Sequence, residues 1–311
     1  MKAVTIKAYG NSEVIDFVSD APKPSAQANQ VMVEVHSASL NPIDSMIRAG
    51  YLHQLLPLHF PAVLAGDFAG VVVEVGADVT SLRVGDEVYG QAGALLGGSG
   101  SLAEFTAVAR DKVALKPTSL TMDQAAALPL TGASAIQAIE EYIQLQPGQR
   151  ILIHGGMGGV GSLAIQLAKY HGAFVATTVE SRSLDAARQL GANQLIDYRT
   201  QDFTTLIDEY DAVLVNVADA LAGSYQVLRK GGVLVSLVGQ LNQTLVQERG
   251  ITAYRQVSQV NTDQLTRLAT LADAGAIKPV LANQFTLEQT KAAFTYFEQA
   301  RPQGKVTVII R

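Results

Sequence analysis

One glycine-rich stretch limits what this chain can fold into more than any other feature. The short apolar run 151–153 is followed by Gly156, Gly158 and Gly161 in a G-x-G-x-x-G pattern, and apolar residues then recur at helical spacing from Val160 onward. This order predicts a strand, a tight turn and a helix. In such a unit the first glycine permits the turn, the second lets the backbone approach a pyrophosphate, and the third lets the helix pack closely on the strand.

The same stretch predicts an anion site. The unpaired amides of the first helical turn, together with the positive end of the helix dipole, would face a phosphate group. The alternative is a glycine turn that joins a strand to a helix and binds nothing, because a short glycine motif alone is a weak signal. The strands and helices that alternate downstream favour the nucleotide site. We therefore expect six consecutive residues to bind the cofactor: Gly156, Met157, Gly158, Gly159, Val160 and Gly161.

The rest of the chain predicts an α/β protein of two domains. Its 311 residues suffice for two hydrophobic cores. Residues 1–119 are short β-type runs separated by turns, which indicates a mainly β, partly open barrel-like domain. Residues 120–260 alternate strands and helices, which implies a doubly wound parallel sheet with helices on both faces. Residues 261–311 end in a strong β run and are expected to complete the first domain, with substrate in the crevice between the domains.

Local patterns predict the individual elements. Strands are expected at 3–7, 31–37, 70–75, 87–89, 105–109, 174–179, 194–197, 212–217, 233–238, 279–285 and 306–310. Helices are expected at 123–128, 132–143, 184–190, 262–273 and 287–299, the first two separated by Pro129.

Composition and charge exclude several classes of protein. The net charge of −5 and the lack of a basic run argue against nucleic acid and against an anionic membrane surface as partners. No stretch approaches the ~18 uninterrupted apolar residues of a membrane span, and Met1 to Val4 leads directly into strand-like sequence, so we expect a cytoplasmic protein. The chain has no cysteine, which excludes disulfides, thiolate metal ligands and a cysteine nucleophile.

Several ordered motifs resemble one family across nearly the whole chain. They are Asn41-Pro42-Ile43-Asp44, Gly66 to Val72, Gly85 to Gly90, Ala103 to Phe105, Ala125 to Gly132, the glycine turn and Gly304-Lys305-Val306. In these motifs the chain resembles the medium-chain dehydrogenase/reductase superfamily, and within it the zinc-independent quinone oxidoreductase branch. The resemblance implies a GroES-like β domain, a Rossmann domain, a nicotinamide cofactor and a homodimer.

The residues at the family's metal positions argue against zinc. The zinc-dependent alcohol dehydrogenases of this superfamily use a cysteine where this sequence has Asn41, a His-Glu pair where it has Asp67-Phe68, and a four-cysteine lobe for structural zinc. Without Cys or His at these positions, the ligands for tetrahedral zinc are missing, and no metal site is expected. None of the histidines is spaced as a metal-binding pair, and His154 is expected to be structural.

Without a metal, hydride transfer must rely on positioning. The protein would supply orientation, water exclusion and hydrogen bonds to the developing oxyanion. The resemblance thus implies a small hydrophobic electrophile as substrate, a quinone or an α,β-unsaturated carbonyl such as an enone or enal. Two alternatives stay open: a zinc-free carbonyl or alcohol oxidoreductase, and a nucleotide-binding protein with little turnover.

Asn41 and Tyr51 are the candidate catalytic residues. The amide of Asn41 can both donate and accept near the nicotinamide or the substrate oxygen; alternatively, Asn41 is only a turn residue before Pro42. Asp44 is expected to order this loop. In relatives a tyrosine of the following segment contacts substrate or cofactor, and Tyr51 is the nearest match and a hypothetical proton donor. Lys305 fits a family position but is expected to be an exposed lysine in a Gly-Lys turn.

Further cofactor contacts are expected at strand ends. Thr131 resembles the family threonine whose hydroxyl faces the nicotinamide; alternatively it caps a helix after Pro129. Thr178 lies near the end of the second Rossmann strand. The backbone of Val238 and Gly239, at the end of another strand, could hold the carboxamide.

The choice between NADPH and NADH depends on the end of the second Rossmann strand. Glu180 lies where an acidic side chain holds the adenosine ribose hydroxyls of NAD and repels a 2′-phosphate. Arg182 follows two residues later, and Tyr198 matches a tyrosine that borders the 2′-phosphate in similar reductases. The alternative is that Glu180 and Arg182 are solvated residues at a helix start. On family grounds we expect NADPH, with NADH possible.

Overall fold

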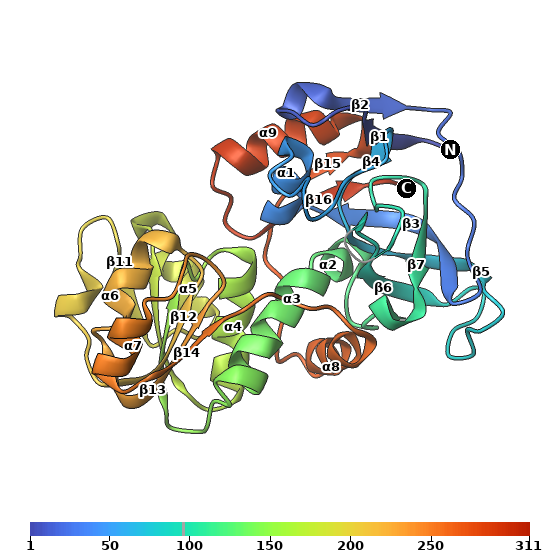
Figure 1. The fold of residues 1–311 in the computed structure, drawn as a ribbon. Helices are drawn as coiled ribbons and strands as arrows, with labels where there is room; N and C mark the ends of the chain where they lie inside the picture. The colour runs from blue at the N-terminus through green and yellow to red at the C-terminus, as the bar shows by residue number, and fades with distance from the viewer. Residues whose placement is uncertain (95–96) are drawn as a thin grey trace. The chain divides into compact units, whose positions relative to one another are not determined.

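The computed structural model describes residues 1–94 and 97–311 and divides into two compact units. The first unit consists of Met1–Leu130, Val260–Gly275 and Pro279–Arg311, and the second of Thr131–Gln259 and Ala276–Lys278. Both chain termini lie in the first unit (Figure 1). The second unit is therefore an insertion in the sequence of the first.

The first unit is built from β-sheets. A small sheet has the order β2, β1, β4, formed by Ile15–Val18, Ala3–Ile6 and Ala62–Val63. A larger sheet has the order β15, β16, β3, β5, β6, β8, with β7 paired to β3. Its strands are β3 (Gln30–Ser39), β5 (Asp67–Val75), β6 (Glu87–Gln91), β7 (Phe105–Ala109), β8 (Val113–Leu115), β15 (Leu281–Thr286) and β16 (Lys305–Ile309).

Strand β3 contributes three valines to the core of this sheet. Val31, Val33 and Val35 are buried and pack with Phe68 and Val72 of β5. The last strand of the chain lies in the first unit, where β16 runs antiparallel to β3. The helices of this unit are α1 (Pro42–Ala49), α2 (Met122–Ala126), α8 (Thr262–Asp273) and α9 (Thr290–Gln299).

The second unit contains a parallel sheet of the order β11, β10, β9, β12, β13, β14. Its strands are β9 (Arg150–His154), β10 (Phe174–Val179), β11 (Gln194–Asp197), β12 (Tyr210–Val215), β13 (Leu228–Ser236) and β14 (Thr252–Arg255). Figure 1 shows this sheet with helices packed around it: α4 (Gly159–Tyr170), α5 (Leu184–Gln189), α6 (Leu221–Ser224) and α7 (Gln243–Arg249). The predicted α/β fold, with a GroES-like β unit and a Rossmann-like sheet, is confirmed.

Helix α3 begins where the sequence predicted a break. Pro129 is the first residue of α3 (Pro129–Ile136), which continues as a π-helical segment over Gln137–Tyr142. Proline suits the first position of a helix because the amide there has no intrahelical partner and the fixed φ matches the helix. In the described part of the chain, none of the helices is both long and apolar enough to cross a membrane.

Candidate active site

The glycine turn connects β9 to α4, as its spacing predicted. Gly158 is the N-cap residue of α4, and Gly159, Val160 and Gly161 form its first turn. The backbone amides of a first helical turn have no carbonyl four residues earlier to bond within the helix. They are therefore available to an anion at the helix N-terminus.

The three glycines of the G-x-G-x-x-G pattern differ in how much space an added Cβ would have. A Cβ at Gly156 would lie 2.1 Å from the hydroxyl of Thr177, and a Cβ at Gly161 would lie 2.2 Å from the carbonyl oxygen of Gly155. Internal packing therefore requires glycine at both positions. A Cβ at Gly158 would meet its nearest neighbour only at 3.3 Å. A side chain at this position would need only a small shift of the Gly155 carbonyl, so packing demands glycine less strongly there than at the other two positions. The motif predicts a glycine at this position where a ligand approaches the backbone closely.

The buried His154 is linked to the glycine turn by hydrogen bonds through Thr178. The hydroxyl of Ser224 donates to the carbonyl of Ala220 (2.7 Å) and so accepts from Nε2 of His154 (3.1 Å). Nδ1 is then the acceptor for the hydroxyl of Thr178 (3.1 Å), which itself accepts the amide of Gly155 (3.2 Å). Burial lowers the pKa of His154 to about 3, so the ring is neutral. This agrees with the structural role expected for His154, and it shows the Thr178 hydroxyl bound within the unit.

The structure brings Glu180, Arg182 and Tyr198 together and adds Arg199. The Glu180 carboxylate accepts from the hydroxyl of Tyr198 (2.7 Å), from Nη2 of Arg199 (2.8 Å) and from Nε of Arg182 (2.9 Å). The bond from Tyr198, followed by that from Arg199, lowers the pKa of Glu180 to about 2. The Glu180 carboxylate faces two guanidinium groups, while the neighbouring Asp197 carboxylate also interacts with Arg199 and offsets part of their positive charge. Sequence reasoning missed Arg199, which reaches Glu180 only because β11 pairs with β10.

The backbone of Val238 and Gly239 lies just beyond the end of β13. The hydroxyl of Ser236 bonds both the amide and the carbonyl of Val238, and the carbonyl of Gly239 accepts from Nε of Arg255 (2.8 Å). These carbonyl groups therefore already have partners within the unit. A carboxamide contact at this strand end stays a prediction.

Thr131 is the third residue of α3, not its cap. It is 6% exposed and follows Pro129 and Leu130 in the first helical turn. The alternative reading as an N-cap is therefore wrong. Its predicted contact with the nicotinamide stays a prediction.

In the first unit, Asn41 belongs to a buried polar cluster with Asp44, Asp67 and Lys305. Nδ2 of Asn41 donates to Asp67 (2.8 Å), and Oδ1 accepts from the Lys305 ammonium (2.6 Å). The Asp44 carboxylate accepts the backbone amide of Asn41 (2.7 Å), which fixes the start of α1. Asn41 is thus a helix N-cap with Pro42 as first helical residue, and Asp44 orders this segment as predicted.

Lys305 corrects an expectation from the sequence. It is 3% exposed rather than solvated, and its ammonium donates to the carbonyl of Leu40 (2.8 Å) as well as to Asn41, at 3.6 Å from Asp67. Pairing of β16 with β3 buries the lysine, an effect that the local Gly-Lys sequence does not encode. Burial raises the pKa of Asp67 and lowers that of Lys305, while their mutual attraction opposes both shifts.

Tyr51 does not lie beside Asn41. Asn41 precedes α1 and Tyr51 follows the Gly50 residue that ends it, so about 12 Å of helix separates the two. The Tyr51 side chain is 77% exposed. The structure therefore does not unite the two candidate catalytic side chains.

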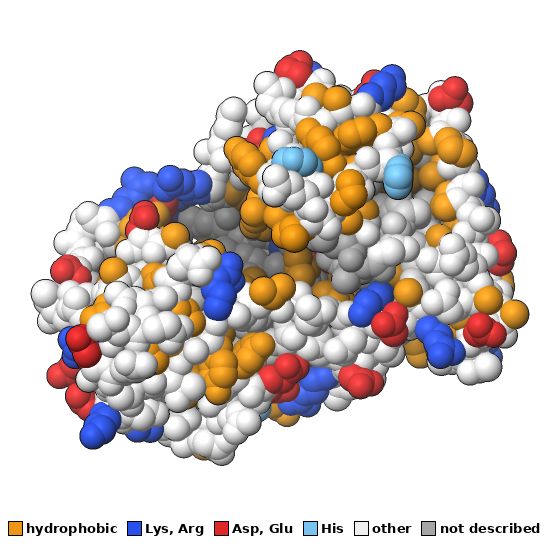
Figure 2. Space-filling view, viewed as in Figure 1, with side chains coloured by type: hydrophobic (Ala, Val, Ile, Leu, Met, Phe, Trp, Pro, Cys, Tyr) orange, Lys and Arg blue, Asp and Glu red, His pale blue; other side chains and the backbone are white. Residues whose placement is uncertain are grey.

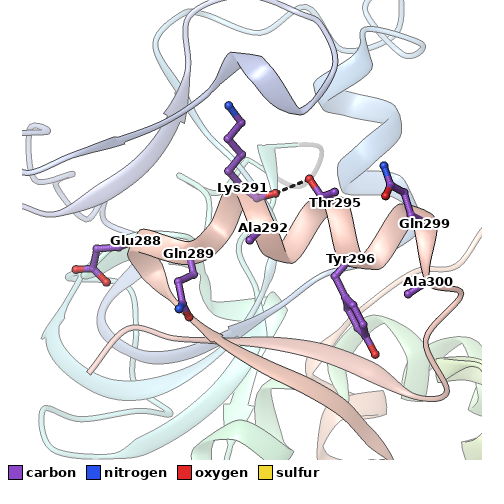
Figure 3. Close-up of a pocket in the computed structure, with 8 residues that line it drawn as sticks. All are labelled: Glu288, Gln289, Lys291, Ala292, Thr295, Tyr296, Gln299 and Ala300. Carbon is purple, nitrogen blue, oxygen red and sulfur yellow. Dashed lines mark hydrogen bonds between the residues drawn. The ribbon is translucent and has the colours of Figure 1, made fainter.

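A depression over α9 is not a candidate site. Its lining residues lie along one helix and the segment preceding it: Glu288, Gln289, Lys291, Ala292, Thr295, Tyr296, Gln299 and Ala300. Figure 3 shows Lys291 and Tyr296 pointing to opposite sides of the helix, and Thr295 bonding the Lys291 carbonyl (3.0 Å). Side chains that diverge in this way cannot surround a ligand. On the face in Figure 2, basic and acidic side chains are scattered in small groups among white and hydrophobic ones.

Two family models match parts of this chain. Residues 27–118 match the family model of the alcohol dehydrogenase GroES-like domain, and residues 190–308 match that of the zinc-binding dehydrogenase. A 2-methylene-furan-3-one reductase of Solanum lycopersicum is 37% identical over 99% of this chain and 79% of its own length. The chain belongs to the medium-chain dehydrogenase/reductase superfamily.

Other relatives place it in the quinone oxidoreductase-like branch. A chloroplastic NADPH-dependent alkenal/one oxidoreductase of Arabidopsis thaliana is 36% identical, over 99% of this chain and 79% of its own length. The structure of a quinone oxidoreductase from Coxiella burnetii is 33% identical with a TM-score of 0.91, covering 100% of this chain and 99% of that one. The Escherichia coli quinone oxidoreductase complexed with NADPH is 26% identical with a TM-score of 0.88, and both chains are fully covered (100%).

The cluster around Asn41 does not fit the zinc that one family model's description implies. Where zinc-dependent members carry Cys and His-Glu, this chain has Asn41 and Asp67-Phe68, and the Lys305 ammonium already lies between the two polar side chains. A cation at this position repels a metal ion. Within residues 1–94 and 97–311, no group of three or more His, Cys, Asp or Glu side chains could hold a metal.

A dinucleotide does fit the second unit. The turn provides free helix N-terminal amides and a glycine, Gly158, whose missing Cβ leaves ligand space. The group around Glu180 adds positive charge and a tyrosine hydroxyl. These two features lie at the carboxyl ends of β9 and β10. In parallel sheets of this kind, nucleotides bind at the carboxyl ends of the strands.

Proposed function

We propose that this chain is an NAD(P)H-dependent oxidoreductase that reduces a quinone or an α,β-unsaturated carbonyl. The observation that carries the proposal is the glycine turn at the N-terminus of α4, where packing requires Gly156 and Gly161 but leaves Gly158 free for a ligand. The names of the relatives support the substrate class, since they include an alkenal/one oxidoreductase and quinone oxidoreductases.

Each part of the site has a separate task in this proposal. The amides of Gly159, Val160 and Gly161 hold the pyrophosphate, and the Glu180 group binds the adenosine ribose. Bound reduced nicotinamide supplies the hydride. Thr131 and the Val238 backbone orient the nicotinamide ring. The protein contributes binding, orientation and exclusion of water, and no step uses a metal.

A screen of electron acceptors tests the proposal. NADPH and NADH oxidation are measured with 1,4-quinones, enals, enones and simple aldehydes and ketones. Turnover of quinones or enones supports the proposal, whereas faster reduction of simple carbonyls supports a carbonyl oxidoreductase. Tight cofactor binding without oxidation on any acceptor contradicts an enzyme and supports a nucleotide-binding role.

We propose NADPH as the preferred cofactor because Glu180 is outnumbered by Arg182 and Arg199. The variant Glu180→Gln removes the one carboxylate and frees both guanidinium groups for a 2′-phosphate. NADPH affinity is expected to rise about tenfold while NADH affinity changes little or falls. Fluorescence titration gives both dissociation constants. The control Asp185→Asn removes an exposed carboxylate that also pairs with an arginine, and it should change neither.

Two results of that titration would contradict the NADPH proposal. The first is tighter binding of NADH than of NADPH by the unsubstituted protein. The second is a loss of NADH affinity in Glu180→Gln with no gain for NADPH. Either result would mean that Glu180 holds the ribose hydroxyls of NAD.

Tyr51 stays a candidate proton donor. If its hydroxyl protonates the reduced substrate, Tyr51→Phe lowers kcat by about 100-fold without changing NADPH affinity. The control Tyr170→Phe changes another exposed tyrosine, at the end of α4. Unchanged NADPH oxidation by Tyr51→Phe would contradict the hypothesis. Because the Tyr51 side chain is highly exposed, its substitution is expected to leave the fold intact, so a change in kcat relative to Tyr170→Phe would report on catalysis.

A homodimer and a cytoplasmic location also stay predictions. Strand β14 forms one edge of the parallel sheet within the described residues, and Tyr254 on it is partly exposed. Such an edge can pair with a strand of a second copy. Relatives include proteins named as mitochondrial and chloroplastic.

A further inference from the structure

The Lys305 ammonium makes two hydrogen bonds and one ion-pair contact inside the first unit. It donates to the carbonyl of Leu40 (2.8 Å) and to Oδ1 of Asn41 (2.6 Å), and it faces the Asp67 carboxylate at 3.6 Å. An ammonium group has three donors and no acceptor. Lys305 is therefore held inside the first unit by groups from two separate segments of the chain, residues 40–41 and Asp67.

This engagement fixes the orientation of the Asn41 amide. Its oxygen accepts from Lys305 and its nitrogen donates to Asp67 (2.8 Å). A flipped amide would put an NH₂ group against the ammonium and an oxygen against the carboxylate. The charges on Lys305 and Asp67 thus permit one orientation and forbid the other.

Asp67 extends the arrangement to a second predicted site residue. Its carboxylate oxygens accept the backbone amide of Leu130 at 3.2 and 3.3 Å. Leu130 lies in the first turn of α3 and is followed directly by Thr131. One ion pair therefore anchors both the start of α1, through Asn41, and the start of α3.

Stability alone is a weak explanation for such a pair. Burying two charges costs solvation, and well-packed apolar residues of similar volume often replace a buried ion pair without loss of stability. What an apolar pair cannot do is orient an amide and hold a helix amide at the same time. The ion pair is therefore better explained by the geometry that it imposes.

We propose that Lys305 is a positioning residue, whose ammonium fixes Asn41 and, through Asp67, the start of α3 in the geometry that hydride transfer requires. In this role the Lys305 ammonium holds Asn41 and Asp67, which lie at positions where zinc-dependent members of the superfamily have metal ligands. The inference rests on the proposed function, because it concerns the orientation of predicted site residues.

The test separates positioning from folding by removing both charges together. Lys305→Met alone leaves Asp67 buried without a partner and is expected to lower the unfolding midpoint strongly. Lys305→Met/Asp67→Asn removes both charges of the pair, so neither partner is left buried alone. This double variant is expected to recover most of the midpoint and to bind NADPH within about threefold of the unsubstituted protein, yet to lose about 100-fold in kcat. Recovery of kcat together with the midpoint would overturn the proposal.

A matched lysine provides the control. Lys116 is partly buried, with a side chain that is 7% exposed, and it donates to two backbone carbonyls, those of Pro117 (3.0 Å) and Leu120 (2.7 Å), beside the exposed Glu87. It touches no predicted site residue. Lys116→Met/Glu87→Gln is therefore expected to change the midpoint but to keep kcat.

A second readout does not depend on activity. The side-chain NH₂ signal of Asn41 in a ¹⁵N spectrum, assigned by its loss in Asn41→Asp, should be sharp and slow to exchange with solvent. In the Lys305→Met/Asp67→Asn variant it is expected to shift and to exchange at least tenfold faster, and in the Lys116 variant to stay unchanged. An unchanged signal in the first variant overturns the inference.

The two readouts distinguish failure of the inference from failure of the proposed function. If none of the tested acceptors supports NADPH oxidation by the unsubstituted protein, the proposed function fails. The NMR comparison alone then decides whether Lys305 orients Asn41. If it turns over enones or quinones and the double variant does so equally well, the function stands and the inference fails.

Discussion

Gly158→Ala is expected to weaken NADPH binding by about 100-fold while costing less than about 1 kcal/mol of unfolding free energy. The backbone of Gly158 has φ −73° and ψ 171°, which any residue adopts, and a Cβ there meets its nearest neighbour at 3.3 Å. The added methyl is therefore accommodated by a small shift of the Gly155 carbonyl. We expect it to obstruct the approach of a pyrophosphate to the first turn of α4.

Gly161→Ala gives the contrasting result. Its Cβ would lie 2.2 Å from the carbonyl oxygen of Gly155 and 2.9 Å from Cα of Gly156, so backbone must move. We expect a loss of about 3 kcal/mol in stability together with the loss of binding. Fluorescence titration with NADPH and thermal denaturation of both variants measure the two effects. If Gly158→Ala binds NADPH like the unsubstituted protein, the turn does not hold a pyrophosphate, and the proposed function loses its main support.

Local spacing was sufficient to predict this turn, because strand, glycines and helix lie within about twenty consecutive residues. The same holds for the helix over Thr262–Asp273 and for strands β10 and β11, whose predicted bounds agree with the structure. Helix α1 was missed although its signals are present. Asn41, Pro42 and Asp44 occupy the N-cap, first and third helical positions, a pattern typical of a helix start.

Residues joined by distant pairing could not be predicted from local sequence. Lys305 and Asn41 are separated by 264 positions and meet only because β16 pairs with β3. Arg199 reaches Glu180 only because β11 pairs with β10. Strand β14 lacked an apolar pattern because it lies at a sheet edge and is mostly exposed. In each case the deciding contact is tertiary, while the sequence pattern describes only neighbours in the chain.

The second large expected effect is a dependence of stability on pH, and it is caused by Asp44. Burial is the main cause that raises the pKa of Asp44 to about 7; the Asp67 charge adds to it, while the Asn41 amide and Lys305 oppose it. Between about pH 4 and pH 7 the folded protein keeps a proton that the unfolded chain has released. The contribution of Asp44 to stability is therefore fully present below the unfolded pKa and is lost as pH rises through about 7.

Asp44→Asn is expected to remove this loss, because an amide stays neutral at every pH and can still accept the Asn41 amide. The variant should match the unsubstituted protein near pH 4 and exceed its unfolding free energy by about 2–4 kcal/mol at pH 8. Urea denaturation at pH values from 4 to 8 measures the difference. A constant difference across that range would contradict the prediction.

The difference between the two proteins is the informative quantity, because His154 acts in the opposite direction. Its pKa of about 3 in the folded protein means that the unfolded chain binds the extra proton between about pH 3 and pH 6.5, so its contribution raises stability as pH increases. In the unsubstituted protein the two trends partly cancel below pH 6.5, and in Asp44→Asn the rising trend of His154 is no longer opposed by Asp44. Asp273→Asn is the control: Asp273 has a lowered pKa, caused mainly by the Ser119 amide. Its contribution is lost only as pH falls into the acid range, so this variant should leave the slope between pH 5 and pH 8 unchanged.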